Sequence, residues 1–131
     1  MARTLTSTIT LSSTTTGSDA LSFSVAADLG IDLPIKNIGR VALNASGGAD
    51  TTLITSPSAA ITYLYVKNMG LQTDGTTATT NVAVLETGGT AFAEVPAGEW
   101  ALIPVVDGRS IDAISGSSHT VIIEYGYWTK A

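Results

Sequence analysis

His119 is the only histidine of the chain, and it is the residue that most invites a catalytic interpretation. It lies in "GSSHTV", where a nearby serine and a distant aspartate would complete a Ser-His-Asp arrangement for acyl transfer. A zinc site would need several imidazole or thiolate ligands, and the sequence holds no cysteine. Because the segment precedes the last predicted strand, we interpret His119 as an exposed turn residue rather than a catalytic base.

Two pairs of acidic residues raise the possibility of glycosidic-bond cleavage, which needs two carboxyl groups across a cleft. The pairs are Glu94 with Glu99, and Asp107 with Asp112. Glu94 and Glu99 flank a predicted tight turn, so their side chains are expected at a solvated rim. We interpret both pairs as surface charge. We predict no catalytic residue, no cofactor and no metal ligand, and therefore no enzymatic activity.

Aromatic residues offer a third kind of chemistry, the stacking of sugar rings on a sheet face. Residues i and i+2 of a strand share a face. The same rings also suit a core or a subunit contact, since Tyr and Trp combine a large apolar area with one hydrogen-bonding tip. We favour a core or interface role, with Trp100 and Trp128 as candidate interface residues, for the set Tyr63, Tyr65, Trp100, Tyr125, Tyr127 and Trp128.

The composition argues against nucleic acid and membranes as partners. Charged residues make up 13% of the 131 residues, the formal net charge is −5, and the six Lys and Arg are scattered along the chain. No stretch approaches the roughly 18 apolar residues of a membrane span, and the N-terminus lacks the apolar run of a secretion signal. We expect a cytoplasmically made protein that is held together by packing or by association with copies of itself.

The elements that must position these residues are strands. In "RTLTSTITL" apolar residues alternate with threonines, which is the period of a half-buried strand. A helix beginning at Ser18 is the competing interpretation of the second run. The rest of the sequence has no long amphipathic segment with helix-capping residues at both ends. The pattern therefore predicts a single all-β domain, an antiparallel β-sandwich of the jelly-roll type with about eight strands. The further runs are "ALSFSVAADL", "IGRVALNAS", "AITYLYVKNMG", "TNVAVLET", "AFAEV", "WALIPV", "RSIDAISG" and "HTVIIEYGYW".

The stretch "VPAGEWALIPV" (95–105) combines turn residues with an alternating strand. We predict that Pro96 occupies the second position of a four-residue turn, with Ala97 and Gly98 at its tip, and that this turn reverses the chain between "AFAEV" and "WALIPV". Proline cannot donate a hydrogen bond to a central ladder. Pro104 therefore marks the second strand as an edge strand or as one broken by a bulge.

The first 17 residues are predicted to form a strand and a tether, and residues 18–131 the sandwich domain. The tether "SSTTTGS" spans at most about 25 Å when extended, at roughly 3.6 Å per residue, which is enough to cross a subunit boundary. We therefore predict that residues 4–11 act as an assembly arm on a neighbouring subunit or capsid, with Leu5, Ile9 and Leu11 as contacts. Pairing within the chain's own sheet is the alternative. This tether and "QTDGTTATT" (72–80) are the predicted mobile loops.

Three segments between residues 61 and 128 together resemble the small β-sandwich structural proteins of tailed-bacteriophage particles. They are "YLYVKNMG", "TNVAVLETGGTAFAEVPAGEWALIPVVDGRSIDAISG" and "TVIIEYGYW". The shared features are a V-x-N-x-G turn, a P-x-G-E-aromatic turn, an alternating strand that ends near a proline, a short I-x-A strand and a closing strand.

This resemblance implies a non-enzymatic virion protein, most simply a capsid decoration or cement protein that binds the phage head as a symmetric oligomer, often a homotrimer. Its partners would be copies of itself and the major capsid protein. A neck, tail or fibre component is also compatible with the resemblance. A glycan-binding β-sandwich remains the alternative from a different functional class.

Overall fold

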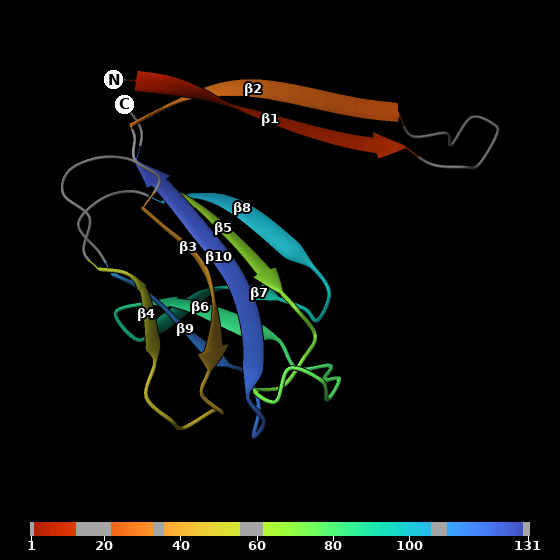
Figure 1. Ribbon diagram of the computed structural model, residues 1–131, viewed down its shortest axis with the longest axis vertical. Coiled ribbons are helices and arrows are strands. Elements are labelled where there is room, and N and C mark those ends of the chain that lie inside the picture. The colour runs from red at the N-terminus through yellow and green to blue at the C-terminus, as the bar shows by residue number, and fades with distance from the viewer. Residues whose placement is uncertain (1, 13–21, 33–35, 56–61, 106–109, 130–131) are drawn as a thin grey trace.

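In the computed structural model, the described part of the chain is built from β-strands (Figure 1). The structure describes residues 2–12, 22–32, 36–55, 62–105 and 110–129, and these ranges contain ten strands and no helix. Accordingly, they hold no helix that could cross a membrane. The all-β prediction is confirmed. The competing helix is wrong over residues 22–32, because these form a strand that is paired along its whole length.

Two four-stranded antiparallel sheets face each other and form the sandwich. We call the sheet with strand order β3-β10-β5-β8 the front sheet and the sheet with order β4-β9-β6-β7 the back sheet. The front strands are β3 (Lys36–Leu43), β10 (Val121–Thr129), β5 (Thr62–Asn68) and β8 (Trp100–Val105). The back strands are β4 (Thr51–Ile54), β9 (Ile111–Ser115), β6 (Ala83–Thr87) and β7 (Thr90–Val95).

Successive strands of the sandwich alternate between the two sheets, except for the β6–β7 hairpin. This crossing pattern, with eight strands in two sheets, is that of a jelly roll, so the predicted sandwich is confirmed. The prediction missed β4. Only four residues long, β4 has a register shift between Thr52 and Ile54, so its two buried residues, Leu53 and Ile54, are adjacent instead of alternating.

The core lies between the sheets and follows the period-2 pattern of the sequence. Along β5 every second residue is buried, as the pattern "TYLYVKN" predicts. The β9 strand has the same alternation. Apolar side chains from both sheets form one cluster, which consists of Leu43, Leu53, Ile54, Leu64, Val66, Ala83, Leu85, Val95, Val105, Ile111, Ala113, Val121 and Ile123.

The turn at residues 96–99 joins the two sheets. The Glu99 backbone N–H donates to the Pro96 carbonyl at 3.0 Å, so Pro96 is the first residue of the turn. The prediction of Pro96 at the second position is therefore wrong by one residue. Gly98 occupies the third position with a φ of 83°, which favours glycine.

The strands on either side of this turn do not pair with each other, contrary to the predicted reversal. Of these, β7 pairs with β6 in the back sheet, whereas β8 pairs with β5 in the front sheet. The turn is thus a crossing between sheets. The prediction from Pro104 is confirmed, because β8 is the edge strand of the front sheet.

Asn68, at the end of β5, holds this crossing in place. Its side-chain amide donates to the carbonyls of Asn81 at 2.8 Å and Val95 at 3.0 Å, and its side-chain oxygen accepts from the Gly70 N–H at 2.9 Å. Its backbone N–H and carbonyl bond to Glu99 and Gly98 of the turn. The side chain is fully buried, so a front-sheet residue satisfies backbone groups at the ends of back-sheet strands.

A separate hairpin precedes the sandwich. It consists of β1 (Ala2–Ser12) and β2 (Ser22–Asp32), which pair antiparallel in their own two-stranded sheet. Figure 1 shows the hairpin lying across one end of the sandwich, with its far end projecting beyond β8. The N-terminal strand therefore pairs with the next strand of its own chain. The remaining residues of the predicted tether, 13–18, lie outside the described residues.

We expect Asn68→Ala to destabilise the fold strongly. The substitution leaves two carbonyls and one N–H without their partner, and each such buried group costs about 1–3 kcal/mol, so we expect a loss of at least about 3 kcal/mol. Urea unfolding followed by tryptophan fluorescence measures this loss. Asn44→Ala is the matched control, because exposed Asn44 also donates to a backbone carbonyl, that of Ala49 at 2.7 Å. A loss of less than about 1 kcal/mol in both variants would contradict the role given to Asn68.

Candidate interaction surfaces

The structure places His119 in an exposed turn, as predicted. Its Nδ1 lies 3.3 Å from the Ser118 hydroxyl oxygen. The hollow beside it, about 350 Å³ in volume, is lined by uncharged polar residues such as Gln72 and Asn81, and no acidic residue is among its described lining. The described geometry thus gives His119 no carboxylate partner at this hollow.

The structure describes three of the four candidate carboxylates, which were interpreted from the sequence as surface charge. Glu94 is on β7 of the back sheet, whereas Glu99 leads into β8 of the front sheet, and Asp107 lies outside the described residues. Instead, Asp112 is directly opposite Glu86 in the β6–β9 register and accepts a 2.7 Å hydrogen bond from Thr52. Among described residues, no group of three or more His, Cys, Asp or Glu could hold a metal ion.

The "QTDGTTATT" loop, predicted to be mobile, carries its own hydrogen-bond network. Asp74 accepts hydrogen bonds from the backbone N–H groups of Thr76 and Thr77 and from the Thr77 hydroxyl. These hydrogen bonds lower the pKa of Asp74 to about 2, and the bond from the Thr77 side chain has the largest effect, followed by those from the backbone N–H groups. Thr79 also donates to Gly70, so both ends of the loop are tied together.

The aromatic residues divide between the two faces of the front sheet. Tyr125 and Tyr127 pack against the core. The β-sheet register places Trp128 opposite Tyr63 on the outer face. Trp100 is opposite Lys67 at the edge of the same face and is 54% exposed. The sequence alone does not separate these rings, because period 2 does not say which face of a strand is buried.

A small polar network crosses the outer face of the front sheet. The Arg40 Nε lies 3.3 Å from a carboxylate oxygen of Glu124, which is opposite Arg40 on the neighbouring strand. Partial burial, the nearby charge of Glu124 and a hydrogen bond to that carboxylate all raise the pKa of Tyr65. Paired charge and partly buried aromatic residues therefore lie side by side on this face.

The predicted assembly residues fall on two surfaces. Ile9 and Leu11 lie on the hairpin and are 37% and 51% exposed, and Val25, paired with Ile9, is 47% exposed. The position of Leu5 is opposite Leu29 in the register, and its side chain lies outside the described residues. The alternation of "SFSVAADL" predicts Val25 on the inward, apolar face of its strand, whereas the structure leaves its side chain exposed.

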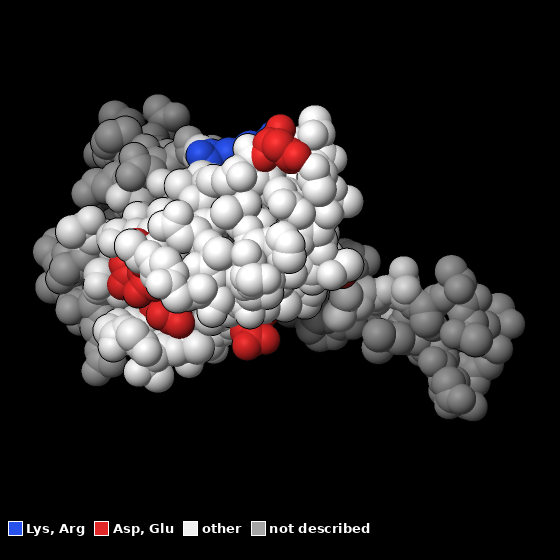
Figure 2. All heavy atoms as spheres, turned by 90° about the horizontal axis from the view of Figure 1, so that it is seen from below, with Lys and Arg blue, Asp and Glu red and all other residues white. Residues whose placement is uncertain are grey.

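Trp100 and Trp128 both lie on the outer face of the front sheet. Trp128 is half-buried, and its indole N–H is buried without a hydrogen-bond partner among the described residues. Figure 2, which views the end of the sandwich away from the hairpin, shows a mostly uncharged surface with a few acidic groups and a basic group beside one of them. Exposed apolar and aromatic side chains thus lie on the hairpin and at the edge of the front sheet, and the end shown in Figure 2 carries little charge.

Neither the models of known protein families nor the curated protein sequences that were searched gave a match to this chain. The interpretation of these surfaces therefore depends on their own geometry and chemistry.

We expect Glu124→Gln to lower the pKa of Tyr65 towards the ordinary value of about 10, because it removes the negative charge that disfavours the phenolate. Tyrosine NMR signals followed through an alkaline titration measure this change. Because the folded-state pKa is raised, the protonated phenol stabilises the fold below pH 10, and this contribution is lost as the pH rises through the folded-state pKa. Glu94→Gln, on the back sheet, is the control. An unchanged Tyr65 pKa in Glu124→Gln would contradict the assignment.

Proposed function

We propose that this chain is a non-enzymatic structural protein that works by assembling with copies of itself, and that its place is in a tailed-bacteriophage particle. The most specific form of the proposal is a capsid decoration or cement protein that binds the head as a symmetric oligomer, with a trimer favoured. Such a protein would assemble in the host cytoplasm and remain in the virion. The particle assignment is supported by the resemblance of residues 61–128 to small phage β-sandwich proteins.

The observation that carries the assembly part of the proposal is the β1–β2 hairpin. A two-stranded hairpin is at best marginally stable in water, and this one exposes the aliphatic side chains of Ile9, Leu11 and Val25. An apolar sheet face of this kind needs cover. The low charge of the sequence is compatible with permanent contacts between subunits.

Glycan binding is the second candidate function, and the outer face of the front sheet supports it. Trp100 is 54% exposed at the edge of this face, and the face also carries tyrosines and paired charges. Exposed aromatic rings provide the apolar surface on which a sugar could stack, and neighbouring polar groups could bond its hydroxyls. A glycan-binding module would need no particle partner.

Binding to isolated heads distinguishes the two functions. We expect the purified chain to cosediment with heads of the phage that encodes it, saturably and in a fixed ratio to the major capsid protein. Trp100→Ala is the comparison variant, because it removes the most exposed ring of the aromatic face. Absence of saturable binding to any part of the particle would contradict the virion role. Retention on a polysaccharide column that Trp100→Ala abolishes would favour the second function.

A further inference from the structure

We infer that the aliphatic row of the β1–β2 hairpin of one copy docks on an apolar pocket in the front sheet of a second copy. The inference rests on the proposed self-assembly and identifies the two surfaces that meet. The hairpin is the donor, and the acceptor lies between β3, β10 and the segment that follows β5.

The donor face of the hairpin is apolar, whereas polar side chains on its opposite face contact one another. Ile9 and Val25 are directly opposite each other, and Leu11 follows Ile9 on the same face. On the other face, the Thr6 hydroxyl donates to Asp28 at 2.9 Å, and the Thr10 and Ser24 hydroxyl oxygens lie 3.4 Å apart. Burial of the aliphatic row would therefore remove apolar surface from water without removing partners from the polar face.

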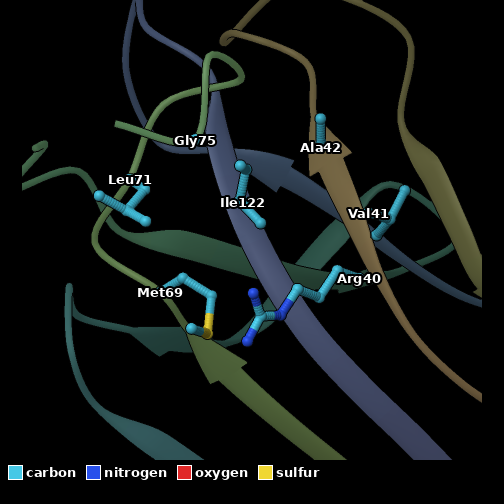
Figure 3. A pocket seen from close by; sticks show the side chains of 7 residues that line it. All are labelled: Arg40, Val41, Ala42, Met69, Leu71, Gly75 and Ile122. Carbon is cyan, nitrogen blue, oxygen red and sulfur yellow. The ribbon is translucent and has the colours of Figure 1, made fainter. Parts of the chain in front are cut away.

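The acceptor is a pocket of about 200 Å³ on the outer side of the front sheet. Figure 3 shows Ile122 in its middle, between Met69 and Leu71 on one side and Val41 and Ala42 on the other. Arg40 also lines the pocket, with its guanidinium reaching towards Met69, and it is already paired with Glu124. An apolar cavity of about 150 Å³ can hold a benzene-sized group, so this pocket has room for an aliphatic side chain.

The hairpin and the pocket of one chain lie at opposite ends of the front sheet. The pocket includes Ile122 near the start of β10, whereas β2 passes over the C-terminal end of β10 (Figure 1). From Ile122 to Trp128 the strand rises about 20 Å at about 3.3 Å per residue. The far end of the hairpin projects away from the sandwich, so a second copy is the partner that can bring donor and acceptor together.

The area of the hairpin face favours a reciprocal arrangement. Two strands of about 36 Å in length, about 4.8 Å apart, present a face of at most about 350 Å². If two copies exchange hairpins across one two-fold interface, each copy buries about 700 Å² there, close to the roughly 800 Å² per partner of a standard interface. In a head-to-tail ring, of which a trimer is the smallest example beyond a pair, the same area is divided between two interfaces of about 350 Å² per partner.

Disulfide trapping tests this contact, and the absence of cysteine from the chain leaves no competing thiols. One tagged chain carries Leu11→Cys and a differently tagged chain carries Ala42→Cys, both at exposed positions. A disulfide requires Cα atoms within about 7 Å, so mixing under a mild oxidant should give the mixed dimer. Ser24→Cys, on the polar face of the same hairpin, should give much less mixed dimer with Ala42→Cys.

Sedimentation velocity of Ala42→Arg provides the second measurement. A charge placed at the pocket should shift the oligomer towards monomer, whereas Ala91→Arg, at the exposed edge strand of the back sheet, should not. Circular dichroism checks that each variant is folded. The inference is overturned if Leu11→Cys links only to itself, or if no mixed dimer forms and Ala42→Arg assembles like the wild type. Failure of head binding alone would overturn the virion role but not this contact.

Discussion

The sandwich depends on the burial of one polar side chain, that of Asn68, between the ends of its sheets. At the point where the chain crosses from β7 to β8, backbone groups leave one ladder before they enter the other. Such groups must find partners when they are buried. Asn68 provides both donors and an acceptor in a single side chain, which no apolar residue of similar size could do.

This arrangement also links two motifs that are far apart in the sequence. The V-x-N-x-G segment ends β5, the P-x-G-E segment begins β8, and Asn68 bonds to the backbone of the second motif from within the first. Gly98 supplies the left-handed backbone conformation that lets the turn approach Asn68. With this end of the sandwich fixed, β8 is positioned as an edge strand, and its alternation places Trp100 on the outer face.

The sequence predicted the strands well because their alternation reports directly on burial, as in β5 and β9. It did not predict β4, whose register shift breaks the alternation at Leu53 and Ile54. It also could not show that β7 and β8 belong to different sheets, because a turn motif specifies local geometry and not the ladder that each flanking strand joins. For the same reason the sequence could not show that Glu86 and Asp112 lie opposite each other on neighbouring strands, since strand register is set by the tertiary fold.

The surfaces were predicted in part. Ile9 and Leu11 were named from the clean alternation of the first strand, and the structure leaves both exposed. Their pairing with β2 makes the apolar face twice as wide as a single-strand arm. The pocket at Ile122 could not be anticipated, since it combines β3 and β10 with the segment after β5, and these come together only in the folded chain.

The central claim is that the β1–β2 hairpin is stabilised by a second copy, and amide hydrogen exchange measured over a range of protein concentrations tests it most directly. Because an isolated hairpin is only marginally stable, the protection of the β1 and β2 amides should rise with concentration as copies associate. Protection of the β5 and β10 amides in the sandwich should change much less over the same range. Hairpin amides that are strongly protected in the dilute monomer, or unprotected at every concentration, would contradict the account.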